Sequence, residues 1–154
     1  MTPTEPVIRF LHVTGAILFL GTLFVNYRIK SAAEKDGRSD ILSFAYKLIR
    51  KNDVALSLPG LLLIVGCGLG LVGVFKAAVM RPWLFASLGL MLGVLGGWMG
   101  GIIPAQIALS KIDNPELSQE AVKKASGRWN MGWWVTMIST MLILLFMIAR
   151  GALL

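Results

Sequence analysis

The sequence is poor in the residues on which several kinds of site depend. It has one cysteine, Cys67, and one histidine, His12, which excludes an intrachain disulfide and a metal cluster built from cysteines or histidines. Only 15% of its 154 residues are charged and 56% are hydrophobic, which excludes an ordinary soluble domain. It contains no phosphate-binding loop, dinucleotide fingerprint, zinc motif or serine–histidine–aspartate arrangement.

What the sequence does have is four long apolar runs. They cover residues 7–27, 54–75, 83–109 and 129–149. Each is long enough to cross a bilayer as a helix, which takes about 20 residues. Because the runs are continuous rather than alternating, they predict helices and not the strands of a barrel. We therefore expect one all-α membrane domain over residues 1–154, a polytopic bundle of four transmembrane helices in contact with the lipid bilayer.

The charge pattern predicts an orientation. The net charge is +7, but the basic residues lie in the gaps between the runs and form no single stripe, so nucleic acid is not an expected partner. Most of them fall in the first and third loops, residues 28–51 and 111–128. The positive-inside rule then puts both loops in the cytoplasm and both termini on the periplasmic side of a bacterial inner membrane.

Each basic loop is expected to hold a short amphipathic surface helix. In the first loop, four apolar residues share one helix face: Ile41, Phe44, Ala45 and Leu48. This face predicts a helix that lies on the inner leaflet and leads into the second membrane helix. In the third loop, Asn114 and Pro115 form a helix start signal and Gly127 a stop signal, which predicts a separate short helix.

Glycine and proline predict how the membrane helices pack. Glycine recurs every four residues along the third run, at Gly89, Gly93, Gly97 and Gly101. Small residues let helix backbones approach closely in lipid, so this face predicts tight packing inside the bundle. Contact with a second copy or with a larger membrane complex is the alternative. Pro59 and Pro104 each lack an amide donor and free a carbonyl one turn earlier, which predicts kinks that face the bundle interior.

His12 is the first candidate for chemistry. It shares one helix face with Gly15, Phe19, Thr22 and Asn26. We expect this face to point inward, because polar groups are costly toward lipid. An imidazole there can ligate a haem iron or copper or relay a proton, and a hydrogen-bonded structural histidine is the alternative. Met141 and Met147 lie at a compatible depth for a second axial ligand, so haem b is the cofactor considered.

A second polar group is expected at the inner side of the membrane. Its members come from all four helices: Asn26, Asp53, Ser57, Gln106, Arg128 and Asn130. Asp53 and Arg128 have opposite charge and lie where a run begins, which predicts that they pair or share a hydrogen-bond network. A structural latch is the simpler interpretation. A vestibule for a substrate or a proton is the functional one.

Four stretches carry a resemblance to a known family. They are FLHVTGAILFLGTLFVNYRIKSA at residues 10–32, AYKLIRKNDVALSLPGLLLIVGCGLGL at 45–71, PWLFASLGLML at 82–92 and IIPAQ at 102–106. In order and spacing they resemble an uncharacterised bacterial integral membrane family, the domain-of-unknown-function family 2269. The resemblance covers nearly the whole chain.

The layout is also similar to two better-known proteins, the membrane domain of the copper-resistance protein CopD and the haem-associated protoporphyrinogen oxidase HemJ. The positions that match HemJ-like chains are His12, Asp53 with Pro59-Gly60, and Arg128 with Asn130. This similarity implies that His12 faces a haem or a metal. HemJ-like chains have further histidines, and CopD-like copper sites have more ligands than this chain offers, so neither activity is carried over.

Three functions follow as hypotheses. The first is a small haem- or metal-associated, redox-linked membrane protein with His12 as ligand. The second is a non-catalytic accessory subunit of a larger membrane complex, held by the glycine-rich faces. The third is an oligomeric transporter of a metal ion or small solute. The helix breaks at Pro59 and Pro104 are the evidence for it.

Overall fold

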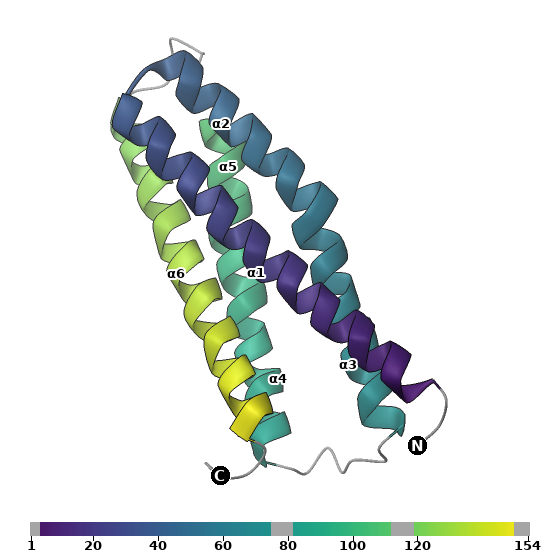
Figure 1. The fold of residues 1–154 in the computed structure, drawn as a ribbon. Helices are drawn as coiled ribbons and strands as arrows, with labels where there is room; N and C mark the ends of the chain where they lie inside the picture. Colours follow the sequence, from purple (N-terminus) through teal and green to yellow (C-terminus); the bar gives the residue numbers. More distant parts are fainter. Residues whose placement is uncertain (1–3, 75–81, 112–118, 150–154) are drawn as a thin grey trace.

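The computed structural model describes residues 4–74, 82–111 and 119–149, and nearly all of them are helical (Figure 1). The helices join into four rods. The first is α1 (Glu5–Asp36); the second is α2 (Ser39–Asn52), η1 (Asp53–Ser57) and α3 (Leu58–Val74); the third is α4 (Pro82–Leu95), η2 (Gly96–Ile102) and α5 (Ile103–Leu109); the fourth is α6 (Gln119–Ala149). All 4 rods are long and apolar enough to cross a membrane. The predicted all-α polytopic bundle is confirmed.

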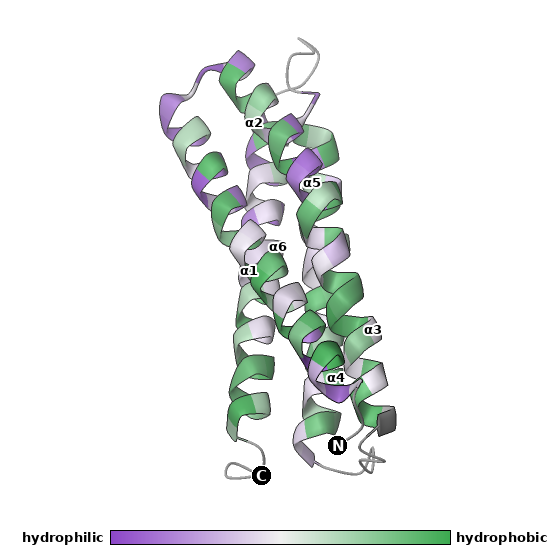
Figure 2. Cartoon of the chain, turned by 45° about the vertical axis from the view of Figure 1, so that its right-hand side comes forward, coloured by the Kyte–Doolittle hydropathy of each residue, from purple (hydrophilic) through white to green (hydrophobic). Residues whose placement is uncertain are grey.

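Large apolar side chains on the surface mark the part of each rod that faces lipid. The exposed ones run from Val7 to Val25, from Val54 to Leu69, from Phe85 to Ile107 and from Met131 to Ile148. Figure 2 shows hydrophobic residues along most of the bundle and hydrophilic ones gathered toward the end where α1 meets α2. A belt of this extent identifies a membrane surface. It coincides with the four predicted spans, and Phe44 is the one large apolar residue exposed outside it within the described ranges.

The helices continue well beyond this belt, which differs from the expected loops. Residues 39–52 are helical, but α2 runs on through η1 into α3 instead of lying on the leaflet. Its buried residues Tyr46 and Ile49 face protein, because α1 and α5 extend beside it and cover its apolar stripe. Residues 119–127 form the first turns of α6 and not a separate helix. The predicted helix end at Gly127 is therefore wrong. The signal at Asn114 and Pro115 lies outside the described residues.

The rods pack as two pairs, α1 with α3 and α4 with α6. In each pair, glycine lets the backbones touch. A Cβ atom at Gly15 would lie 2.7 Å from the Gly60 carbonyl oxygen, which fixes the first crossing. A Cβ atom at Gly97 would lie 2.5 Å from the Thr136 hydroxyl and 2.7 Å from the Gly132 carbonyl oxygen, which fixes the second. In lipid, such close approach supplies the attraction between helices.

Most glycines of the predicted face therefore pack against other helices of the same chain. Gly93 meets the Ser139 side chain and Gly101 meets the Gly132 backbone, as Gly97 does one turn away. Gly89 is different, since nothing lies within 4 Å of the position where its Cβ would stand. Three members of the stripe pack α4 and η2 against α6, and the fourth faces outward.

Both prolines follow a π-helical turn. The turn η1 precedes Pro59 and η2 precedes Pro104, and in each the amide bonds to a carbonyl five residues back, Leu58 to Asp53 and Ile103 to Trp98. Because Pro104 has no amide proton, the Gly100 carbonyl one turn earlier is free. Arg128 of α6 binds that oxygen through Nε at 3.1 Å and Nη2 at 2.8 Å. The freed carbonyl thus finds the partner that a membrane interior demands.

At one end of the bundle α1 begins and α6 ends (Figure 1), as an even number of crossings requires. The assignment of this end to the periplasm stays a prediction.

Candidate functional site

The inner polar group is centred on Asp53, which stands on the π turn η1. Its side chain is buried, with 4% of the residue surface exposed. Oδ1 accepts hydrogen bonds from Asn26 Nδ2 at 2.9 Å and Ser57 Oγ at 2.7 Å, and Oδ2 accepts one from Gln106 Nε2 at 2.6 Å. These donors come from α1, from η1 itself and from α5, so one carboxylate ties the first three rods together.

Two further side chains border this network. Asn52 is half-buried and donates to Asn26 Oδ1 at 3.0 Å, which extends the network toward the surface. The Trp98 indole N–H approaches the Asp53 carboxylate, but it does not meet hydrogen-bond geometry and has no other partner in the described structure. The Trp98 ring contacts Phe19 edge to face at 6.0 Å. The polar network therefore ends at an aromatic layer.

Two residues predicted for this group lie elsewhere. Arg128 binds the Gly100 carbonyl instead of Asp53, because Pro104 leaves that oxygen free nearby. Asn130 is only half-buried and joins no hydrogen bond of the Asp53 network within the described residues. The structure thus brings together Asn26, Asp53 and Gln106, and the expected pairing of Asp53 with Arg128 is wrong.

A second polar cluster, which sequence reasoning missed, closes the part of the bundle beyond the belt. Lys30 is buried, and its ammonium pairs with Glu34 at 2.6 Å and lies 5.2 Å from the centre of the Trp129 ring. Glu34 also accepts from Tyr46 at 3.2 Å and from Ser126 at 2.5 Å. The spacing of Lys30 and Glu34, one helical turn apart, was the available signal. The cluster holds α1, α2 and α6 together and is structural.

The tryptophans near the start of the fourth run are also packed inside. Tryptophans at the end of an apolar run are typical interfacial anchors, yet Trp129 and Trp133 are buried against α1. Trp133 stacks on Tyr27 at 4.5 Å and donates to the Leu23 carbonyl at 3.0 Å. Only Trp134 of this group is exposed, as an aromatic at a membrane surface should be.

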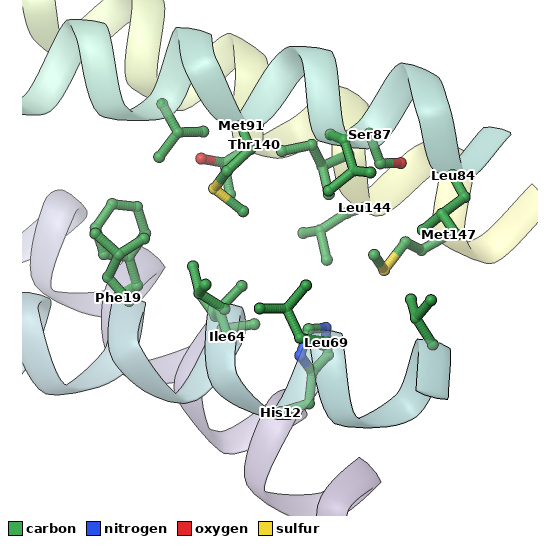
Figure 3. A pocket seen from close by; sticks show the side chains of 18 residues that line it. His12, Phe19, Ile64, Leu69, Leu84, Ser87, Met91, Thr140, Leu144 and Met147 are labelled. Atoms are coloured by element: carbon green, nitrogen blue, oxygen red, sulfur yellow. The ribbon is translucent and has the colours of Figure 1, made fainter. Parts of the chain in front are cut away.

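The half of the bundle in which α1 begins and α6 ends holds a pocket between the two helix pairs. Its volume is about 140 Å³. Figure 3 shows its walls, with His12, Phe19 and Ile64 on the side of α1 and α3, and Met91, Thr140 and Met147 on the side of α4 and α6. Leu69 and Leu88 also line it and are 63% and 46% exposed on the lipid-facing surface. The pocket is therefore apolar and reaches the bilayer between α3 and α4.

His12 supplies the polar atom of interest in this pocket. Its Nδ1 is buried against Gly68 of α3. The Ile64 backbone lies near the imidazole, but no group of the described structure meets hydrogen-bond geometry with Nδ1, which is costly for a polar group. The hydroxyls of Ser87 and Thr140 also lie in the wall, but each donates to a carbonyl of its own helix, Trp83 at 2.8 Å and Thr136 at 2.7 Å. Among the described residues that line the pocket, His12 thus carries the one buried side-chain polar atom without a hydrogen-bond partner.

The predicted ligand set is only partly assembled. Met147 lines the pocket on the wall opposite His12 (Figure 3). Met141 does not line it, because the rotation of α6 turns that side chain toward lipid, where it is 41% exposed. Within the described residues, no three His, Cys, Asp or Glu side chains gather around a common point. Met141 is therefore wrong as a ligand in this structure.

Haem b does not fit the pocket as it stands. Pockets for drug-sized ligands have about 300–1,000 Å³, and a porphyrin needs at least that much space. A cavity of roughly 150 Å³ lined by aliphatic and aromatic side chains accommodates benzene. The pair of His12 and Met147 suits an iron chemically. The pocket volume of about 140 Å³, however, is that of a site for a ligand with a single six-membered ring.

The comparisons with known proteins add one match. The sequence model of a family described as "Predicted integral membrane protein (DUF2269)" matches residues 6–151. No curated protein and no solved structure matches the chain. The similarities to CopD and HemJ stay predictions. Since the family model covers nearly all of the chain, this protein belongs to the DUF2269 family of predicted integral membrane proteins.

Proposed function

We propose that the protein is a membrane-embedded binding protein that takes a small, ring-shaped, redox-active lipophile from the bilayer and holds it beside His12. The observation that carries this proposal is that His12 Nδ1 is buried without a hydrogen-bond partner in the described structure, beside a pocket whose remaining lining is apolar or already hydrogen-bonded. A ligand with one polar atom on an apolar ring satisfies that nitrogen and fills the space.

The shape of the pocket supports entry from lipid. The lining residues Leu69 and Leu88 belong to the exposed belt, so a molecule dissolved in the bilayer reaches the pocket without crossing water. A quinone head group has the required size, a flat ring with oxygens at its edge. Histidine suits both of its redox states, because an imidazole N–H donates to a quinone carbonyl and a bare ring nitrogen accepts from a quinol hydroxyl.

The test is the binding of a short-chain benzoquinone to the protein in lipid nanodiscs. We expect saturable binding to the natural sequence, and at least about tenfold weaker binding to His12→Leu because one charge-free hydrogen bond is lost. Met141→Leu is the matched control, since that residue lies outside the pocket, and it should bind normally. Equal binding by the His12 variant, or none by the natural sequence, would contradict the proposal.

An absorption spectrum of the same preparation tests the haem hypothesis directly. A Soret band that disappears in His12→Leu would mean that the pocket widens to admit a porphyrin. In that case the single-ring ligand class is rejected and haem-linked redox function takes its place.

A second candidate is an accessory subunit. Gly89, Gly96 and Gly100 are exposed, and a Cβ at any of them would meet nothing within 4 Å. They lie on one side of the third rod, where another membrane helix could approach closely. Crosslinking in native membranes should then capture a partner that Gly96→Leu releases, while Gly66→Leu, at another open glycine, does not.

The transport hypothesis has weaker support. Phe19 forms part of the pocket wall and packs on Trp98, so this aromatic layer separates the pocket from the Asp53 network. The described residues provide no continuous polar path between the two.

A further inference from the structure

The surroundings of the Asp53 carboxylate suit the reversible binding of a proton as well as the joining of the helices. We propose that Asp53 is a proton-binding site at the inner end of the bundle, which takes up a proton from the aqueous side and releases it there. This proposal is independent of the pocket ligand. It rests on the position of the carboxylate, its partners and the absence of a counter-charge among the described residues.

The geometry around the carboxylate is that of a built site. Three donors from three elements converge on two oxygens at 2.6–2.9 Å, and all three are themselves buried. The Trp98 indole N–H adds a fourth polar group that is buried, unpartnered and close to the same carboxylate. A carboxylate with only neutral neighbours in a membrane bundle is a functional-site hypothesis by default.

No cation neutralises Asp53 within the described residues. The ion pairs found there join Arg9 to Glu5, Lys30 to Glu34 and Arg38 to Asp36. A buried carboxylate that lacks a positive partner can reduce its cost of burial by binding a proton, because the neutral acid loses less hydration.

The charged and titratable groups on the packed elements are accounted for as follows. On α1 they are Tyr27, the exposed Arg28, and Lys30, whose ammonium is held by Glu34. On α2 they are Tyr46, whose hydroxyl donates to Glu34, and the exposed side chains of Lys47, Arg50 and Lys51.

The other elements near Asp53 add little charge. Cys67 is the one such side chain on α3, three turns from η1, and η2 and α5 carry none. On α6, Arg128 is bound to the Gly100 carbonyl. A proton is thus the only charge that the described surroundings leave for Asp53 to gain.

A proton fits this site better than a metal ion. The three partners of Asp53 present N–H or O–H groups to it, whereas a cation needs oxygen ligands turned inward. No other carboxylate, histidine or cysteine of the described chain joins Asp53 in a metal-holding group. Protonation needs a smaller change, because the Gln106 amide can turn to present its oxygen to the new carboxyl O–H.

The proton balance is simple. Hydronium at the inner surface gives one proton to an Asp53 oxygen and becomes water, and the reverse step returns it, with no other bond made or broken. Asn52, half-buried and bonded to Asn26, marks the polar approach from that surface. Protonation removes a charge-assisted hydrogen bond between the second and third rods. The charge state of Asp53 therefore sets how firmly these rods are joined.

Infrared difference spectroscopy between acid and alkaline samples tests the proposal. The protein in lipid nanodiscs should show the C=O stretch of a buried carboxylic acid that appears on acidification. The band should be absent in the isosteric variant Asp53→Asn. It should persist in Asp40→Asn, the same change at an exposed aspartate. A band unchanged in Asp53→Asn, or no such band at any pH at which the protein stays folded, would overturn the proposal.

Variants that keep the carboxylate guard against a failure of Asp53→Asn to fold. Ser57→Ala and Gln106→Met each remove one donor, and the frequency of a carboxyl stretch depends on its hydrogen bonds. Each variant should shift the band from its natural position. An unshifted band in both would assign it to another acid and reject Asp53 as the site. Quinone binding is measured separately, so its loss or retention does not affect this result.

Discussion

The two ends of the membrane bundle are held in different ways. Toward the end where α1 meets α2, Asp53, Asn26 and Gln106 link the first three rods through buried hydrogen bonds. Toward the end where α1 begins, the pairs α1/α3 and α4/α6 face each other across an apolar pocket, and His12 Nδ1 beside it has no hydrogen-bond partner in the described structure. The same four rods are thus joined at one end and parted at the other.

The difference follows from lipid as a solvent. Apolar side chains gain little by leaving lipid for one another, so the apolar walls of the outer half provide no drive to close it. When helices associate in lipid, polar groups gain hydrogen-bond partners and glycines gain close van der Waals contact between backbones. Function follows the same division, with a proton at the joined end and a lipophile at the parted end as the two proposals.

The largest effect is expected from Asp53→Leu. This change leaves three buried donors without an acceptor, at about 1–3 kcal/mol each, with membrane values at the low end, so the free energy of unfolding should fall by about 3 kcal/mol. Thermal unfolding in detergent measures it. Val54→Leu, at the neighbouring lipid-facing position, is the control and should change nothing.

The second-largest loss of stability is expected when a single methyl group is added at Gly97. In Gly97→Ala the Cβ would stand within 3 Å of the α6 backbone, which forces α4 and η2 away from it and costs about 1–3 kcal/mol as overpacking does. Gly89→Ala adds the same methyl where nothing lies within 4 Å. If both variants unfold at the same temperature, the glycine stripe does not hold the second helix pair.

A smaller effect is expected at the proline break. Arg128→Gln removes the donors to the Gly100 carbonyl and should lower the free energy of unfolding by about 1 kcal/mol, since Arg128 is exposed and water replaces part of the bond. Pro104→Ala supplies an amide proton to the same helix. In that background the Arg128 change should cost less, and additive costs in the double-mutant cycle would contradict the link.

The smallest effect on stability is expected at the parted end. His12→Leu removes a buried nitrogen that has no hydrogen-bond partner, so the free energy of unfolding should stay within about 1 kcal/mol of its natural value or rise slightly. The same thermal unfolding assay measures it. A loss comparable to that of Asp53→Leu would show that His12 is a structural contact and that the two ends do not differ.

Depth in the membrane could be predicted, whereas rotation about each helix axis could not. Asn26 and Gln106 lie near the ends of the first and third apolar runs, and Asp53 lies at the start of the second. Because successive runs cross the membrane in opposite directions and a helix rises about 1.5 Å per residue, the three residues share one depth. Arg128 shares that level too, yet it turns to the Gly100 carbonyl. Met141 and Met147 were equally plausible partners of His12 by depth, and only the rotation of α6 separates them.

The ends of the spans show the same limit. The sequence predicted a kink at Pro59 but could not reveal the π turn before it, which absorbs the missing hydrogen bond and lets the helix run on. Nor could it reveal the Gly15–Gly60 contact, since single glycines carry no periodic signal.

By itself, the sequence determined that this chain has four lipid-facing spans, where they begin and at what depth their polar residues lie, because hydrophobic length along a helix is a one-dimensional property. The tertiary structure alone decided which helix faces meet. Among the described residues it also gives Asp53 three neutral donors and no cation, and leaves His12 Nδ1 without a hydrogen-bond partner beside a pocket. In lipid the apolar faces are nearly equivalent, so a few glycines and hydrogen bonds choose among them, and their partners are defined only in three dimensions.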